Sequence, residues 1–281
     1  MKEELISQGN KMIGVNGCII CYDDYGNGVI PIIFIHGFPF DKSSWEPQLK
    51  FFKDSHRVIA YDIQGFGKSI ATNEKMSISL FADDLVKFMD ALEIKKAIIC
   101  GLSMGGYILL NALSRYSERF YAIVLCDTQC ISDSTEGKEK RILSIEKIKK
   151  VGINDFAETF IKSVFCSETF NNNRGLVDKV KNIIIDTPTH TIINGMIALA
   201  ERSENCSTLD KIDIPTLIIC GNEDIVTPLA QSRFLNQSIK KSELVVIYKA
   251  GHLSNLEQPD IFNTELLNFI LKLSDISGYE N

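Results

Sequence analysis

The chain has 281 residues, of which 45% are apolar, 23% charged and 9% aromatic, and its 30 basic and 36 acidic side chains give a formal charge of −6. This balance excludes an intrinsically disordered chain, which has fewer apolar residues. It also argues against a nucleic-acid-binding protein, whose surface needs clustered lysine and arginine. The length allows one large α/β domain or two small ones, with a full hydrophobic core.

The number of cysteines and the N-terminal residues together indicate the cellular compartment in which the protein works. Eight cysteines are present, but disulfide frameworks belong mainly to short secreted chains. The first seven residues carry acids and no apolar signal segment, and no apolar run reaches the ~18 residues of a membrane span. We therefore expect a cytoplasmic protein with free thiols and no membrane span.

Two cysteines, Cys18 and Cys21, have the C-x-x-C spacing of redox and zinc sites. They lie in a strand-like run without a second pair, so we favour a structural role over a redox or metal role. The cysteines that we interpret as small hydrophobic residues in strands are Cys18, Cys21, Cys100, Cys126 and Cys220.

The first part of the chain predicts a hairpin, and short apolar runs predict the strands that follow. Residues 11–30 contain a turn at Val15-Asn16-Gly17 that is typical of hairpins. Each apolar run reads as a buried parallel strand, which makes about eight strands with the hairpin. The runs are residues 30–35, 57–61, 96–100, 122–126, 215–220 and 244–248.

Amphipathic segments between these runs predict helices that cover the sheet. Residues 79–89 form one such helix, with Ser79 as the expected N-cap. Its inward residues are Phe81, Leu85, Phe88 and Met89. Residues 259–273 form another, with Pro259 in the first turn. Its inward residues are Ile261, Leu266, Phe269 and Ile270.

Residues 128–207 interrupt the alternation of strands and helices. They contain helical patterns and no strand-like run longer than residues 183–185. Since βα connections are where such sheets accept extra material, we expect a helical cap here, inserted after the sixth strand. The core then comprises residues 1–127 and 208–281. Most of the apolar cap residues should pack on the core and a few should line a substrate pocket. They include Phe156, Phe160, Phe165 and Met196.

A serine follows the strand at residues 96–100 directly, in the sequence Gly101-Leu102-Ser103-Met104-Gly105. A serine at a sharp strand-to-helix turn adopts strained backbone geometry, and flanking glycines remove side chains that would collide around it. Its hydroxyl then projects toward substrate, and the helix N-terminus offers N–H groups to a developing oxyanion. The segment therefore predicts that Ser103 is a nucleophile.

A nucleophilic serine needs a base within hydrogen-bond reach and a group that orients this base. Of the four histidines, His252 follows the last predicted strand. Asp224 follows the strand at residues 215–220, and the chain order Ser, Asp, His is that of one hydrolase architecture. Two other acids stay open as the orienting group: Asp127, which ends the strand before the cap, and Glu223, which adjoins Asp224.

Five motifs in this order resemble the α/β-hydrolase fold superfamily, and in particular its esterase, enol-lactonase and haloperoxidase-like branch. They are His36-Gly37-Phe38-Pro39, residues 61–69, residues 101–106, residues 221–224 and Gly251-His252. The resemblance implies an α/β-hydrolase fold, with a mostly parallel eight-stranded sheet flanked by helices and a helical cap after the sixth strand.

The resemblance also implies a role for each matching residue. Ser103 would be the nucleophile, His252 the base and then the acid, and Asp224 the group that orients the imidazole. The backbone N–H groups of Phe38 and Met104 would form the oxyanion hole. His36 would structure the oxyanion loop rather than act as a base.

Several neighbouring residues have structural interpretations. Relatives in this branch often carry arginine where Gln64 stands, so an ion pair near that turn should be missing. We expect Asp62 to brace its loop, and we disfavour Cys100 as a nucleophile because it is buried in a strand. Trp45 either walls the pocket or anchors a helix beneath it.

The sequence as a whole predicts a serine hydrolase that cleaves a small carboxylic ester or lactone through an acyl-enzyme. No metal or cofactor is expected, because no metal-ligand spacing beyond the weak C-x-x-C and no nucleotide-binding motif is present. Carbon–carbon bond hydrolase, thioesterase and perhydrolase chemistry stay open on the same three residues. So does a hydrolase-fold protein that binds a small molecule without turnover.

Overall fold

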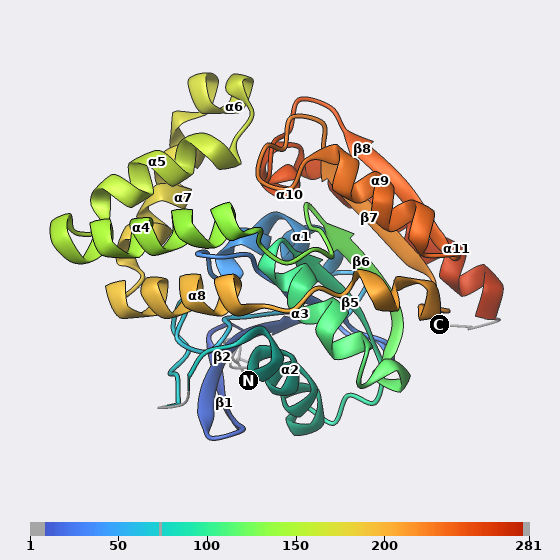
Figure 1. Ribbon diagram of the computed structural model, residues 1–281. Helices are drawn as coiled ribbons and strands as arrows, with labels where there is room; N and C mark the ends of the chain where they lie inside the picture. The colour runs from blue at the N-terminus through green and yellow to red at the C-terminus, as the bar shows by residue number, and fades with distance from the viewer. Residues whose placement is uncertain (1–8, 73–74, 278–281) are drawn as a thin grey trace, which may run out of the picture.

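The computed structural model describes residues 9–72 and 75–277, and an eight-stranded sheet runs through its centre (Figure 1). The strand order is β1-β2-β4-β3-β5-β6-β7-β8. The strands are Lys11–Val15 (β1), Cys18–Tyr25 (β2), Ile32–Ile35 (β3), Val58–Tyr61 (β4), Ala97–Leu102 (β5), Phe120–Cys126 (β6), Thr216–Gly221 (β7) and Ser242–Ile247 (β8). The pairs β1–β2 and β2–β4 are antiparallel and the others are parallel. The predicted fold class is therefore confirmed.

The predicted hairpin and strands are all present, with strand ends shifted by no more than two residues for the six apolar runs. Asn16 and Gly17 both have positive φ, 49° and 82°, as a tight two-residue turn between antiparallel strands requires. In β3, residues 32 and 34 face one apolar cluster and residues 33 and 35 the other. Burial on both faces explains why these strands read as continuous apolar runs.

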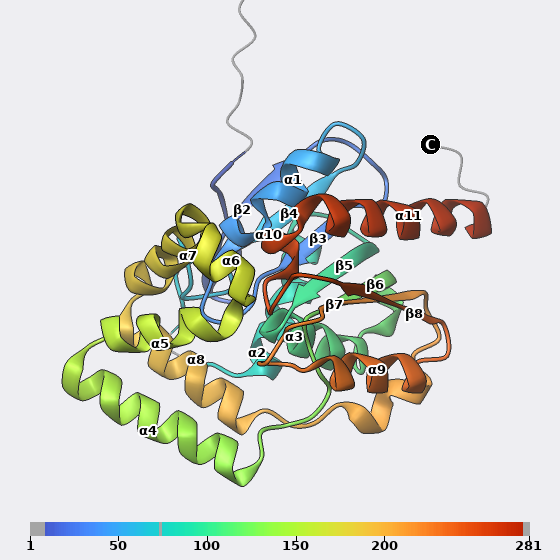
Figure 2. The same cartoon turned by 90° about the horizontal axis from the view of Figure 1, so that it is seen from above.

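Helices cover both faces of the sheet (Figure 2). Glu46–Phe52 (α1) and Pro259–Ser277 (α11) pack on one face, and Ile78–Ala91 (α2), Met104–Leu113 (α3) and Leu229–Ser238 (α9) on the other. The short elements are 3-10 helices at Lys42–Trp45 (η1), Ser117–Arg119 (η2) and Cys206–Lys211 (η3), and the helix Ser254–Glu257 (α10).

Trp45 belongs to the core beneath these helices. It is fully buried, and its ring lies 4.8 Å from that of Phe34 and 5.9 Å from that of Phe262. Of its two predicted roles, the structure therefore favours the anchor.

Two details of the predicted helices are wrong. The N-cap of α2 is Ser77 rather than Ser79, because Ser77 has extended backbone and its side chain accepts a hydrogen bond from the N–H of Leu80. Ile261 of α11 is 46% exposed, and Phe262 is buried in its place. A helix that turns by 100° per residue puts position 262, not 261, on the same stripe as the buried residues at 266, 269, 270 and 273.

Five helices lie between β6 and β7, in the segment 128–207, which we call the insertion. They are Thr135–Val151 (α4), Asn154–Val164 (α5), Ser167–Asn172 (α6), Arg174–Asp186 (α7) and Thr189–Glu201 (α8). Residues 183–185, the one strand-like run, lie inside α7. Within the described part of the chain, no single helix has the length and hydropathy of a membrane span, and α7 with α8 reaches them only as a pair bent by 94°.

The insertion lies beyond the carboxyl ends of the parallel strands (Figures 1 and 2). The Thr191 hydroxyl donates to the carbonyl of Gly65, in the loop after β4, over 3.1 Å. The N–H of His252, in the loop after β8, donates to the carbonyl of Val164 over 2.9 Å. The insertion is therefore fastened to the edge where open α/β sheets bind ligands.

The expectation that all cysteines are free thiols is wrong for two of them. Cys130 and Cys206, separated by 76 positions, form a disulfide where the insertion leaves and rejoins the sheet. The ends of the insertion meet there, since the N–H of Asn205 donates to the carbonyl of Cys130 over 2.8 Å. Such proximity comes from the fold and has no local sequence signal.

The remaining cysteines are buried, as expected for small hydrophobic residues. Cys18 and Cys21 lie among them, and within residues 9–72 and 75–277 no group of three or more His, Cys, Asp or Glu side chains is arranged to hold a metal ion. The cytoplasmic location stays a prediction.

Opening the disulfide should destabilise the protein, because the link restricts the unfolded chain. For a separation of 76 residues, we expect Cys130→Ser/Cys206→Ser to lower the free energy of unfolding by about 2–4 kcal/mol, measured by urea denaturation. Dithiothreitol should destabilise the wild type by a similar amount and leave the double variant unchanged. Equal stability of the wild type with and without reductant would contradict the link.

Candidate active site

The turn between β5 and α3 holds Ser103 in a strained conformation. Its φ is 52° and its ψ is −111°, a region that residues with a side chain rarely adopt. A Cβ on Gly101 would lie 2.5 Å from the carbonyl oxygen of Gly105, and a Cβ on Gly105 would lie 2.4 Å from that of Ile35. Both positions therefore require glycine, as the sequence predicted.

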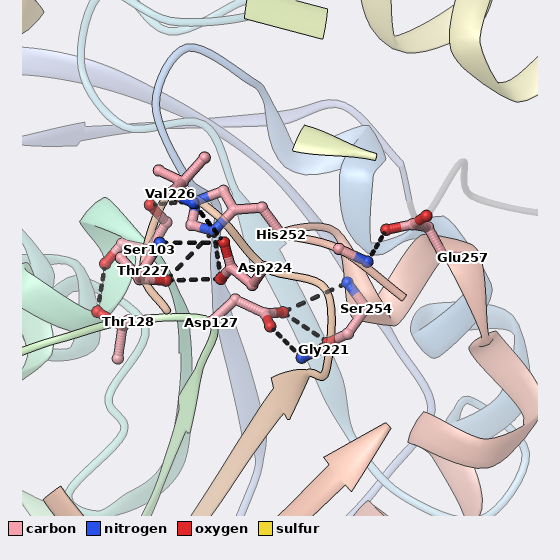
Figure 3. Close-up of polar contacts among 11 residues, drawn as sticks. Ser103, Asp127, Thr128, Gly221, Asp224, Val226, Thr227, His252, Ser254 and Glu257 are labelled. Carbon is pink, nitrogen blue, oxygen red and sulfur yellow. Dashed lines mark hydrogen bonds and ion pairs between the residues drawn. The ribbon is translucent and has the colours of Figure 1, made fainter. Parts of the chain in front are cut away.

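Strand β6 and the residues after it hold this turn in place. The N–H of Ser103 donates to the carbonyl of Cys126 over 2.9 Å. The Thr128 hydroxyl donates to the carbonyl of Ser103 over 2.8 Å. Both the N–H and the carbonyl of Ser103 are thus hydrogen-bonded. Its hydroxyl is the group that points into the site (Figure 3).

An unbroken chain of hydrogen bonds joins Ser103, His252 and Asp224 (Figure 3). The distance between Ser103 Oγ and His252 Nε2 is 2.8 Å, and that between His252 Nδ1 and Asp224 Oδ2 is also 2.8 Å. The three residues come from the ends of β5, β8 and β7, more than 100 positions apart in sequence for Ser103 and His252. The sheet therefore brings the three predicted residues together at one edge.

The loop after β7 fixes the carboxylate of Asp224. Its Oδ1 accepts hydrogen bonds from the N–H groups of Val226 and Thr227, and its Oδ2 accepts one from the Thr227 hydroxyl over 2.7 Å. Burial alone would raise the pKa of Asp224, but the charge of His252 and these hydrogen bonds outweigh burial and lower it. Asp224 is therefore ionised where it meets the imidazole.

The same pair determines the protonation of His252. Burial alone would lower the pKa of His252, but the negative charge of Asp224, its hydrogen bond to the ring and the charges of Asp127 and Glu257 together outweigh burial and raise this pKa above the usual value. With Asp224 accepting from Nδ1–H, the neutral imidazole presents the lone pair of Nε2 to the Ser103 hydroxyl. This tautomer can accept the serine proton.

The two rival acids lie elsewhere. Glu223 is exposed to solvent. Asp127 is fully buried, and its carboxylate accepts from the N–H of Gly221 over 2.8 Å and from the Ser254 hydroxyl over 2.5 Å. Of the three acids, only Asp224 hydrogen-bonds His252.

Asp127 instead connects the loop that carries Asp224 to the loop that carries His252. Gly221 ends β7, three residues before Asp224, and Ser254 lies two residues after His252. Burial and the nearby charge of Asp224 raise the pKa of Asp127 to about 8. The sequence offered Asp127 as a rival acid and gave no sign of this bracing position.

His36 orders the loop that passes beside Ser103. Its Nδ1–H donates to the carbonyl of Gly37 over 2.9 Å, and its Nε2 accepts from the N–H of Ile63 over 3.0 Å. Burial lowers the pKa of His36 to about 4, so the ring is neutral at pH 7. These contacts fit the expected structural role.

The same loop brings two N–H groups to the site. A Cβ on Gly37 would lie 3.2 Å from the Cβ of Ser103, so the backbone leading to Phe38 passes against the serine. Among the residues that the structure describes, the N–H groups of Phe38 and Met104 meet no acceptor. Both are therefore available to an oxygen at the site.

In the loop after β4, Asp62 braces the backbone as expected, and Gln64 stands where relatives often carry an arginine that could form an ion pair. Asp62 accepts from the N–H groups of Lys42 and Lys68, over 2.8 and 2.9 Å. Gln64 donates from Nε2 to the carboxylate of Asp84 over 2.5 Å. The amide of Gln64 thus makes a hydrogen bond to a carboxylate without forming an ion pair.

Glu257 joins the insertion to the loop of His252, and the sequence reasoning missed it. Its carboxylate accepts from the N–H of Gly251 over 2.6 Å and from the N–H of Cys166 over 2.9 Å. Cys166 belongs to the insertion, so this contact and that of Val164 hold it over the site. Ser103 is only 7% exposed.

The sequence matches the family described as the alpha/beta hydrolase fold over residues 30–150 and 162–259. It is 32% identical to 3-oxoadipate enol-lactonase 1 of Acinetobacter baylyi over 82% of this chain and 85% of that protein. It is also 32% identical to a putative non-heme chloroperoxidase of Synechocystis sp., over 89% of this chain and 94% of that protein.

Solved structures agree with these relatives. The thermophilic esterase of Thermogutta terrifontis, in a malate-bound structure, superposes with a TM-score of 0.90 at 30% identity, over 94% of this chain and 99% of that one. The chain therefore belongs to the α/β-hydrolase fold family, in the branch of esterases, enol-lactonases and haloperoxidase-like proteins.

Proposed function

We propose that this protein is a serine hydrolase that cleaves a small carboxylic ester or lactone through an acyl-enzyme intermediate. The observation that carries the proposal is the hydrogen-bond chain from Ser103 to Asp224, with 2.8 Å at each step. The relatives named for esterase and enol-lactonase activity support a hydrolase of this type. The substrate is a small molecule, and the reaction draws on no cofactor.

In the first half of the reaction, Ser103 Oγ attacks the carbonyl carbon and its proton passes to His252 Nε2. The imidazolium that forms is stabilised by the ionised Asp224. The N–H groups of Phe38 and Met104 donate to the tetrahedral oxyanion. As the intermediate collapses, the carbon–oxygen bond to the alcohol breaks, and the leaving oxygen takes the proton from His252.

In the second half, water attacks the acyl-serine while His252 Nε2 accepts a proton from that water. Collapse of the second tetrahedral intermediate releases the carboxylic acid and returns the proton to Ser103 Oγ. With a lactone, the alcohol stays attached to the acyl group, and the product is a hydroxy acid.

The insertion acts as a cap in this proposal. The core comprises residues 1–127 and 208–281, and the cap comprises residues 128–207. Its contacts to Gly65, Glu257 and His252 support this division, because they hold helices over the loops that carry the site. A covered site excludes bulk water and selects substrates that fit beneath the cap.

Other reactions could use the same three residues. Carbon–carbon bond hydrolysis, thioester hydrolysis and perhydrolysis differ from ester hydrolysis mainly in the shape of the pocket and in the nucleophile that deacylates the serine. A protein that binds a small molecule without turnover has no need of a serine bonded to a histidine in the base tautomer. We therefore favour the ester and lactone reaction.

Replacing the nucleophile should abolish turnover. We expect Ser103→Ala to reduce kcat for short p-nitrophenyl esters by on the order of 10⁶-fold, as in serine proteases that lose this residue. The control Ser114→Ala removes an exposed serine at the end of α3 and should keep full activity. A fluorophosphonate probe should label Ser103, and labelling at a different residue would overturn the assignment.

The pH profile should report the raised pKa of His252. The base acts when it is neutral, so kcat/KM should rise with pH, with a midpoint above the usual histidine value of ~6.5. Asp224→Asn removes the charge that raises this pKa, so the midpoint should move to lower pH while kcat falls about 10⁴-fold. Glu223→Gln, the exposed neighbour, should leave the profile unchanged. A profile that moves with Glu223 instead would reassign the acid.

Loss of the Asp127 brace should lower activity without removing any reacting group. We expect Asp127→Ala to reduce kcat by up to about 10²-fold, because small displacements of reacting groups have effects of this size. The variant also leaves buried donors of Gly221 and Ser254 unsatisfied, which should lower its unfolding free energy by about 1–3 kcal/mol. The control is Asp213→Ala, an exposed carboxylate paired with Lys241. Unchanged kcat in Asp127→Ala would show that the two loops hold their positions without it.

A further inference from the structure

The backbone of His252 is hydrogen-bonded to the insertion. Its N–H donates to the carbonyl of Val164 over 2.9 Å. The preceding residue, Gly251, packs so closely on the same stretch that a Cβ there would lie 2.8 Å from the backbone nitrogen of Cys166. We call residues 164–166, which run from the last residue of α5 to the residue before α6, the contact segment. The base of the proposed reaction therefore lies against backbone of the insertion.

The carboxylate of Glu257 bridges the contact segment and the loop of His252. Its Oε1 accepts from the N–H of Gly251 over 2.6 Å (Figure 3), and its Oε2 accepts from the N–H of Cys166 over 2.9 Å. A carboxylate can accept both bonds at once, because each of its oxygens has lone pairs of its own. One side chain therefore fixes the spacing between the contact segment and the residue next to the base.

The other side-chain links between the insertion and this loop are weaker. The thiol of Cys166 donates to the carbonyl of Lys249 over 3.3 Å, and a thiol is a weak donor. Lys249 Nζ lies 3.2 Å from Glu168 Oε2, but both side chains are more than half exposed, and exposed ion pairs contribute little. Hydrogen bonds to an ionised carboxylate are about twice as strong as neutral ones. Of these links, that of Glu257 is therefore the strongest.

We propose that Glu257 is a positioning residue that couples docking of the insertion to the position of the catalytic base. While the contact segment is docked, the ring of His252 lies 2.8 Å from both Ser103 Oγ and Asp224 Oδ2. When the segment moves away, His252 loses the acceptor of its backbone N–H, and its ring is free to leave the hydrogen-bond chain. The inference rests on the proposed function and adds a condition to it: protons are transferred only while the insertion is docked.

Two variants break the bridge from opposite sides. Glu257→Gln keeps the size of the side chain but offers an acceptor to only one of the two N–H groups. Cys166→Pro removes the N–H on the side of the insertion and leaves the carboxylate in place. The backbone accommodates this proline, because the φ of Cys166 is −66° and Phe165 before it is extended, with a ψ of 148°.

Each bridge variant has a matched control. Cys166→Ser keeps the N–H and differs from Cys166→Pro at the same position. Glu168→Gln removes a carboxylate that links the insertion to Lys249 by an exposed ion pair. Both controls should therefore retain wild-type rates.

The kinetic test uses p-nitrophenyl acetate and p-nitrophenyl hexanoate. Each bridge variant should lower kcat/KM on the order of tenfold to 10²-fold, because small displacements of a reacting group have effects of this size. The factor should be the same for both esters, since a displaced base slows every acyl group alike. Glu257→Gln/Cys166→Pro should lose no more than the more damaging single variant, because both changes break one bridge.

Two kinetic outcomes would overturn the inference. A loss that grows with the length of the acyl group would make the contact segment a wall of the substrate pocket rather than a support of the base. Losses that multiply in the double variant would show that Glu257 and Cys166 act independently.

Amide hydrogen exchange, followed by mass spectrometry, tests the coupling without turnover. Cys166→Pro changes only the insertion, yet it should accelerate exchange in the peptide that contains Gly251 and His252. Cys166→Ser should leave this peptide with wild-type protection. Peptides from β3 and β5 serve as the internal check that each variant is folded. Unchanged exchange at residues 251–252 in both bridge variants would overturn the inference.

The two measurements separate this inference from the proposed function. If the wild type hydrolyses both esters through Ser103 and the bridge variants keep full rates, the inference fails and the proposed function stands. If the wild type hydrolyses neither ester, the proposed function fails, and hydrogen exchange decides the coupling alone. Faster exchange at residues 251–252 in Cys166→Pro then supports the coupling, and unchanged exchange in both bridge variants overturns it.

Discussion

The left-handed backbone of Ser103 is the constraint on which the site depends. At a φ of 52°, the chain turns from strand to helix within one residue, which directs the serine hydroxyl out of the sheet edge. The turn is possible because Gly101 and Gly105 leave room for backbone contacts that any side chain would block. Hydrogen bonds from the end of β6 and from Thr128 stabilise it. Strain at one residue is thus held by the last residue of β6 and by a residue just after it.

Asp224 and Asp127 both lie near this turn, but their side chains have different surroundings and different roles. Asp224 accepts hydrogen bonds from its own loop and from His252, and its pKa is lowered although burial opposes this. Asp127 accepts only from groups of the two loops, and burial raises its pKa. The first can stabilise an imidazolium, and the second connects the strand ends that position Asp224 and His252. This division follows from the surroundings of each side chain, since the two residues are chemically identical: Asp224 meets the charge of His252, and Asp127 is buried beside the charge of Asp224.

Local patterns were sufficient to predict the strands, the fold class and the residues that meet at the sheet edge. Strands buried on both faces read as apolar runs, and the glycines around Ser103 mark a backbone that no other residue permits. Ordered motifs then placed Asp224 and His252 after the correct strands. These predictions worked because each depended on a few adjacent residues or on the shared direction of parallel strands.

The features that sequence reasoning missed depend on contacts between distant segments. The Cys130–Cys206 disulfide forms because both ends of the insertion meet, and Glu257 contacts Cys166 across 91 positions. The predicted N-cap of α2 was wrong by two residues, because Ser77 and Ser79 fit the same sequence pattern. The predicted inward residue of α11 was wrong by one, because Ile261 and Phe262 are both apolar. Packing decides between such neighbours, and packing is a property of the whole fold.

The proposed reaction passes through an ester on Ser103. It is tested most directly by mixing the protein with p-nitrophenyl hexanoate, quenching with acid within the first turnover, and identifying the peptide that contains Ser103 by mass spectrometry. This peptide should gain the mass of the hexanoyl group at Ser103, in proportion to the p-nitrophenol released in the first turnover. Release of p-nitrophenol and hexanoate together, with no acyl group on Ser103 at any time, would contradict it.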